Sequence, residues 1–203
     1  MKRIALLAVL ALAIPVAAFA GNVDLQNSGG TLTGNSGGLS LSGSELIAVT
    51  GFNGGGLIQG GLGTMSFTTG ALTGGNLTTG ATFAAGGTFT ITSNGTGGLP
   101  DTTLFSGTFS STVQWTENLN CGPNGAVCYT LTGSIAGTWY NGTTVNGATT
   151  QITFSTGKNG FSGSIPLASG DTVITTVPEP GTLGLLGTGL VGLAGVIRKK
   201  LKA

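Results

Sequence analysis

The chain contains no histidine, and its charged residues are scarce. Only 6% of the 203 residues are charged, whereas about a quarter is typical of globular domains. Without histidine the sequence lacks the commonest general base, the usual partner of serine and cysteine nucleophiles, and the commonest transition-metal ligand. We therefore expect a non-enzymatic protein with no catalytic residue, no metal and no cofactor.

The few charges are unevenly distributed, although the formal net charge is only +1. The cations gather near the two ends, and Lys158 is the only one between residues 21 and 177. That stretch contains five acids and has a net charge of −4; the acids are Asp24, Glu45, Asp101, Glu117 and Asp171. A mildly acidic body offers no basic surface to a phosphate backbone, so we do not expect nucleic acid as a partner.

The first twenty residues have the three parts of a secretory signal peptide. Lys2 and Arg3 form a positive start, residues 4–14 are apolar, and small residues flank the predicted cleavage site at Ala18 and Ala20. This pattern predicts export from the cytoplasm. It also places the mature protein in a compartment where disulfides persist.

The last part of the chain, residues 177–203, also has three parts. The first is a short motif that contains two prolines and therefore favours an extended spacer: Val177, Pro178, Glu179 and Pro180. The second, residues 182–197, is uncharged and would span roughly 24 Å as a helix, against about 30 Å for a bilayer core. The third is cationic and predicts a cytoplasmic membrane stop, formed by Arg198, Lys199, Lys200 and Lys202 within residues 198–203.

Together these three parts resemble the PEP-CTERM sorting signal. The resemblance covers residues 177–203, with 177–180 as the motif, the apolar run as a transmembrane helix and the cations as the stop. It implies processing by an exosortase, a membrane-embedded transpeptidase-like enzyme, followed by release from the inner membrane to the cell surface or extracellular matrix. It also implies a setting of biofilm and exopolysaccharide. A plain tail anchor without processing is the alternative.

The body between the two ends, residues 21–176, has the size of a single domain. Hydrophobic side chains recur there at every second position, which is the period of a half-buried strand. The clearest case is the odd-numbered series Tyr129, Leu131, Ile135 and Trp139, which alternates with small polar residues. No stretch of the body has the period of a helix, so we expect a β-rich extracytoplasmic domain.

Turn signals separate these runs. Glycine is abundant, with 40 residues, and asparagine-glycine pairs adopt positive φ at low cost, so they predict hairpins. Such pairs begin at Asn53, Asn94, Asn124, Asn141, Asn146 and Asn159. The pattern predicts an antiparallel β-sandwich or jelly roll. Because some Gly-Leu-Thr-Gly phrases hint at repeats, a parallel β-solenoid is the alternative.

Cys121 and Cys128 are the only cysteines, and they flank a Pro-Asn-Gly sequence. In an oxidising compartment they are expected to form a disulfide that joins the two sides of a hairpin. Closing a loop of this length contributes about 2.5 kcal/mol by chain entropy. Two thiols without histidine do not complete the usual four-ligand zinc site, so zinc is the weaker alternative.

Carboxylates are the remaining candidates for catalytic residues, since glycosidases use a pair of them. Each of the four candidates is isolated in the sequence, among residues that are typical of turns or strands: Glu45, Asp101, Glu117 and Asp171. Solvated surface charge is therefore the preferred interpretation. A calcium ion held by backbone carbonyls and Asp101 or Asp171 stays open, although no ligand pattern is present.

Whether the body is a structural protein or a carbohydrate-binding module depends on where three aromatic residues lie. Trp115 and Trp139 fit the inward phase of their strands, and Tyr140 follows directly, so core packing is preferred over a sugar-binding surface. We therefore predict a structural or adhesive protein of the envelope or extracellular matrix. The alternative is a carbohydrate-binding module associated with exopolysaccharide, which requires these aromatics to face solvent.

Overall fold

The computed structural model describes residues 21–122, 126–156 and 160–175, which belong to one compact unit, Gly21–Thr176. This part of the chain is all β, with thirteen strands in one sheet and two short 3-10 turns, η1 (Phe52–Gly54) and η2 (Thr96–Gly98). The strands are β1 (Asn22–Ser28), β2 (Thr31–Asn35), β3 (Gly38–Thr50), β4 (Ile58–Thr68), β5 (Leu72–Asn76), β6 (Gly80–Phe83), β7 (Gly86–Ser93), β8 (Thr103–Phe109), β9 (Val113–Gly122), β10 (Ala126–Trp139), β11 (Thr144–Ser155), β12 (Ser164–Pro166) and β13 (Ser169–Thr175).

The two predicted terminal helices, within residues 1–20 and 177–203, lie outside the described residues. The same holds for the cleavage site, the sorting motif and the basic tail. Within the part of the chain that the structure describes, no helix has the length and apolarity needed to cross a membrane.

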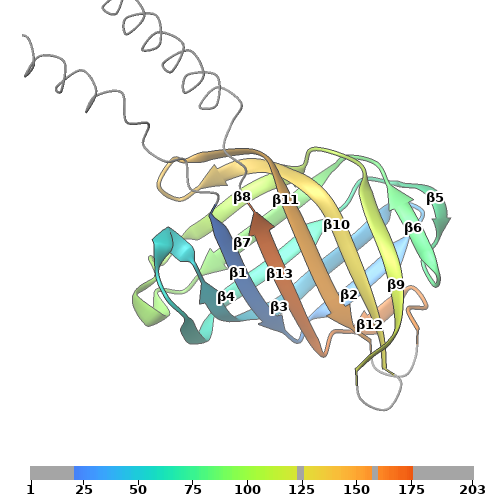
Figure 1. Cartoon of the computed structure of the whole chain (residues 1–203), viewed down its shortest axis with the longest axis horizontal. Helices are drawn as coiled ribbons and strands as arrows, with labels where there is room; N and C mark the ends of the chain where they lie inside the picture. Colours follow the sequence, from blue (N-terminus) through green and yellow to red (C-terminus); the bar gives the residue numbers. More distant parts are fainter. Residues whose placement is uncertain (1–20, 123–125, 157–159, 176–203) are drawn as a thin grey trace, which may run out of the picture. The chain divides into compact units, whose positions relative to one another are not determined.

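Eight strands form a closed ring. Their order is β1-β3-β4-β7-β8-β10-β11-β13, and β13 pairs with β1 to complete the circle. Figure 1 shows β1, β13, β11 and β10 side by side, with β3, β4 and β7 crossing on the other side of the ring. The predicted all-β antiparallel class is confirmed, but the sandwich or jelly roll is wrong, because the sheet closes on itself instead of packing against a second sheet. The parallel solenoid is also wrong, since every described pairing is antiparallel.

Two long strands hold the ring and its side branches together. The 14-residue β10 pairs with β11 along one edge, while its other edge pairs with β9 in its first half and β8 in its second. The 13-residue β3 divides in the same way between β2 and β1. The branches β9-β6-β5 and β2-β12 continue the sheet beyond the ring. A strand that changes partner along its length lets the sheet coil tightly enough to close.

Aromatic side chains fill the interior of the ring. Phe67 lies 5.9 Å from Phe154 and 6.1 Å from Phe109 between ring centroids, and Phe89 contacts Phe105 at 5.9 Å. These rings come from β4, β11, β8 and β7, so they join strands from opposite sides of the ring. Burying one such side chain stabilises the fold by about 1.5–3 kcal/mol, and the ring is therefore a packed core.

Three further aromatic residues close one end of the ring. Trp115 stacks on Tyr129 at 4.5 Å, and both contact Phe161 edge-on. The Tyr129 hydroxyl donates to the Thr78 carbonyl at 2.8 Å and accepts from the Phe161 amide at 2.9 Å. One tyrosine thus connects β10 to the β5-β6 hairpin and to the segment before β12. The predicted inward phase of Tyr129 and Trp115 is confirmed.

Some of the asparagine-glycine pairs form the predicted turns and one does not. Asn141-Gly142 forms the β10-β11 hairpin with Gly142 at φ 83°, and Asn53 itself adopts φ 51° in η1. Asn146-Gly147 does not form a turn, because it lies inside β11 at an irregularity in the pairing with β10, where Gly147 has φ 71°. Asn124 and Asn159 lie outside the described residues.

The predicted disulfide between Cys121 and Cys128 is present, with a Cα–Cα separation of 5.8 Å. It joins β9 to β10 next to an irregularity in their pairing, between Ala126 and Val127. The crosslink therefore connects the β9 branch covalently to the strand that closes the ring.

Replacing Tyr129 with phenylalanine is expected to lower the free energy of unfolding by about 1–3 kcal/mol, because the buried Phe161 amide loses its acceptor. Urea denaturation measures the change. The matched control is Tyr140→Phe, which removes a hydroxyl whose bond to Asn53 is exposed and should change stability by less than about 0.5 kcal/mol. Equal effects of the two substitutions would contradict this role of Tyr129.

Candidate functional site

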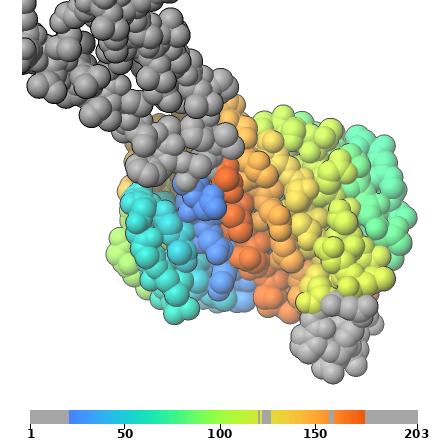
Figure 2. All heavy atoms as spheres, in the orientation of Figure 1, coloured from blue at the N-terminus to red at the C-terminus, as the bar shows by residue number. Residues whose placement is uncertain are grey.

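The outer face of the sheet carries mainly hydroxyl and amide side chains over β9, β10, β11, β13 and β1. Figure 2 shows these strands as one continuous surface. Cross-strand pairing aligns the side chains in rows, of which one consists of Thr116, Thr130, Thr153, Asp171 and Gln26. Hydroxyl and amide groups at regular strand spacing can exchange hydrogen bonds with a hydroxyl-rich ligand.

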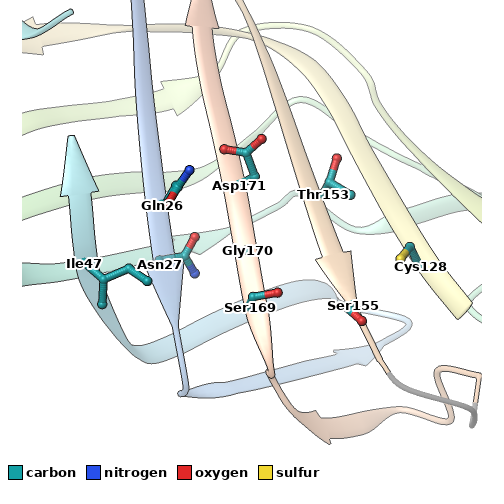
Figure 3. Close-up of a pocket in the computed structure, with 9 residues that line it drawn as sticks. All are labelled: Gln26, Asn27, Ile47, Cys128, Thr153, Ser155, Ser169, Gly170 and Asp171. Atoms are coloured by element: carbon teal, nitrogen blue, oxygen red, sulfur yellow. The ribbon is translucent and has the colours of Figure 1, made fainter. Parts of the chain in front are cut away.

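A shallow hollow of about 400 Å³ lies on this face (Figure 3). It is lined by residues of five neighbouring strands: Gln26, Asn27, Ile47, Cys128, Thr153, Ser155, Ser169, Gly170 and Asp171. Six of the nine lining residues are polar, and one of them carries a carboxyl group. The hollow could therefore hold a small ligand that has both polar and apolar groups.

The floor of the hollow lies where β3 contains one extra residue, Ile47, opposite β1. The pairing of β1 with β3 shifts between Gln26 and Asn27, and the Asn27 side chain is fully buried. Its Nδ2 donates to Ser44 Oγ at 2.6 Å. A Cβ at Gly170 would lie 2.6 Å from Asn27 Oδ1, so only glycine leaves room for the amide. The glycine thereby permits both the buried asparagine and the hollow beside it.

Asp171, at the rim of the hollow, lies within hydrogen-bonding reach of Asp24 on the neighbouring strand. Although the Asp171 side chain is largely exposed, desolvation by its neighbours, together with the hydrogen bond and charge of Asp24, raises the pKa of Asp171 from 3.8 to about 6. Asp24 Oδ1 is buried without a hydrogen-bond partner. The described residues contain no lysine, arginine or histidine to compensate the two acids.

This acid pair is the feature that the sequence did not reveal. Of the four candidate carboxylates for glycoside hydrolysis, only Asp171 has another acid beside it, and that acid is Asp24, which is not one of the four. Glu45 lies on β3, Asp101 in the loop before β8 and Glu117 on β9. Asp24 lies opposite Val173, so Asp24 and Asp171 are diagonal neighbours on adjacent strands. Among the described residues no three His, Cys, Asp or Glu side chains converge.

The three candidate aromatics occupy different environments. Trp115 is 2% exposed and belongs to the core, whereas Trp139 is half-buried against Phe105, at 4.9 Å between ring centroids. Tyr140 is 43% exposed and stacks on Phe52 at 5.6 Å. The predicted core packing is therefore confirmed for Trp115 and holds in part for Trp139, which packs against the edge of the core, whereas Tyr140 presents its ring to solvent.

Residues 176–199 match the family model described as the PEP-CTERM protein-sorting motif. No curated protein and no solved structure is significantly similar to the chain. The match confirms the PEP-CTERM sorting motif that was predicted from the last part of the sequence. The motif indicates an exported protein that is sorted by an exosortase.

The Asp24–Asp171 pair predicts an unusual pH dependence of stability. Because folding raises the pKa of Asp171, the charged form is disfavoured in the folded state, so this group destabilises the protein as pH rises from about 4 to about 6. Asp171→Asn should therefore have a higher melting temperature than the wild-type protein at pH 7.5, and the difference should disappear at pH 4.

Thermal denaturation across this pH range measures the effect. Asp101→Asn, which changes an exposed carboxyl in a loop, is the control and should follow the wild-type protein. A wild-type advantage over Asp171→Asn at pH 7.5 would contradict the proposed repulsion between the two acids.

Proposed function

We propose that this protein is held in the inner membrane as a precursor by residues 182–197 and is then cleaved by an exosortase. Its body, released to the cell surface or extracellular matrix, serves a structural or adhesive role without catalysis. The observation that carries this proposal is the match of residues 176–199 to the PEP-CTERM sorting motif.

Properties of the body support the same role. Its disulfide suits an oxidising compartment outside the cytoplasm. The closed ring leaves no free strand edge in the ring itself, which protects it from edge-to-edge aggregation during export. The outer face offers many hydroxyl and amide groups and few charges, so its contacts with a hydrated polymer would depend weakly on salt.

The sorting step is tested by the mass of the C-terminus. We expect the mature protein from its native host to lack the residues that follow the motif. A variant without Pro178, Glu179 and Pro180 should keep an intact C-terminus and stay in the membrane fraction.

The same variant pair in a host that lacks the exosortase is the control, because both proteins should then remain unprocessed. An intact C-terminus on the wild-type protein in its native host would support the plain tail anchor instead.

Carbohydrate binding is the second candidate, and the exposed ring of Tyr140 favours it. The ring is held by its stack on Phe52 and by the Asn53 amide, which donates to the Tyr140 hydroxyl at 3.1 Å. A fixed aromatic face next to an amide group is a suitable platform for a sugar ring. Since the described residues carry acids and no cations, a neutral polysaccharide fits better than an acidic one.

Trp139 lies next to this platform, with its ring 5.7 Å from Phe52, so its fluorescence reports binding. If the second candidate holds, titration with purified neutral exopolysaccharide of the host shifts the emission of the wild-type protein and leaves Tyr140→Ala unchanged. Emission that is insensitive to the polysaccharide in both proteins would reject it.

A further inference from the structure

The end of the ring where β13 finishes carries exposed apolar side chains. Two loops meet there, residues 51–57 between β3 and β4 and residues 140–143 between β10 and β11. The Asn53 amide joins the first loop to Tyr140 in the second, and Gly51 packs against the Asn22 carbonyl at the start of β1. Both loops therefore belong to the end of the ring that contains Asn22 and Thr175, which are cross-strand partners.

Three large hydrophobic residues are exposed in the described part of the chain, and two of them lie in these loops. Leu57 is 58% exposed and Tyr140 is 43% exposed. Phe52 lies beneath Tyr140, and the half-buried Trp139 contacts Phe52 edge-on. The third exposed residue, Leu119, lies apart from these loops, on β9 near the disulfide.

The length of the chain limits how far this end lies from the membrane in the precursor. Six residues, 176–181, lie between Thr175 and Thr182, where the predicted membrane segment begins. Fully extended, the seven steps from Thr175 to Thr182 reach at most about 25 Å. The 12-residue strand β11 alone extends about 40 Å, so the loops at the β13 end are the part of the ring that the tether holds nearest to the bilayer.

We propose that Leu57 and Tyr140, supported by Phe52 and Trp139, rest on the phospholipid surface while the precursor is held in the membrane. This inference depends on the membrane segment in the proposed function. Tyrosine and tryptophan suit the headgroup region, because each has an apolar ring and a polar tip. The described residues contain no cation, so the contact is apolar and does not require anionic lipids.

Such a contact restricts the orientation of the body relative to the bilayer. Sorting would remove the tether and with it the contact, because one tyrosine and one leucine bind lipid weakly without covalent attachment. The same side chains would then be free in the released protein.

The two tryptophans provide a matched test of this contact. The full-length precursor is reconstituted in neutral phosphatidylcholine vesicles that contain a lipid with a spin-labelled headgroup. Trp115→Phe leaves Trp139 as the only tryptophan, and Trp139→Phe leaves the buried Trp115. We expect at least twofold stronger quenching of Trp139 than of Trp115, and loss of that difference when Leu57→Ser and Tyr140→Ser are added.

Flotation of the same samples separates the two proposals. A precursor that does not float with the vesicles would contradict the membrane segment itself. A precursor that floats while both tryptophans are quenched equally, or not at all, would overturn only the lipid contact. A Trp139 emission shift with neutral polysaccharide but no quenching by the labelled lipid would assign this surface to carbohydrate instead.

Because Trp115 packs in the core, its replacement could prevent folding, and a second measurement uses the wild-type chain. Hydrogen exchange of the vesicle-bound precursor is compared with that of the precursor in detergent. Amides of residues 51–57 and 140–143 should exchange at least threefold more slowly on vesicles, while those of residues 28–31 at the opposite end should be unchanged. Equal exchange of both sets would overturn the proposal.

Discussion

The pairing of β10 with β11 closes the ring, and the rest of the fold depends on it. Eleven consecutive positions of β10, from Cys128 to Thr138, have partners on β11. Without this ladder the sheet would end in two long free edges with its aromatic interior open to water. With it, every strand of the ring has neighbours on both sides, and five phenylalanines from four strands meet in one core.

Closure also creates the outer surface on which the candidate site lies. Because β13 pairs with both β11 and β1, residues from the beginning and the end of the domain become neighbours. Asp24 and Asp171 meet in this way, although 146 positions separate them in the sequence. The buried Asn27 and the small Gly170 shape the hollow beside the pair. The outer face therefore combines rows of hydroxyl and amide groups with one pair of acids.

Local patterns were sufficient to predict much of this molecule. Alternation along β10 predicted which side chains point inward, the spacing of Cys121 and Cys128 predicted the disulfide, and the absence of helical periods predicted the all-β class. Alternation describes one strand at a time, however, and an inward side chain looks the same in a sandwich and in a ring. Neither the closure nor the contact of Asp24 with Asp171 could be predicted, since both depend on which distant strands become neighbours. The sorting motif was predictable because its parts are contiguous in the chain.

The central structural claim is that the sheet is closed, and native-state hydrogen exchange of β10 and β11 tests it most directly. In a closed ring the amides of Leu131, Ile152 and their neighbours exchange as slowly as those of β3 and β4, because opening them requires global unfolding. Fast exchange along one whole edge of β11, as in a terminal strand, would show that the ring is open and would contradict the account.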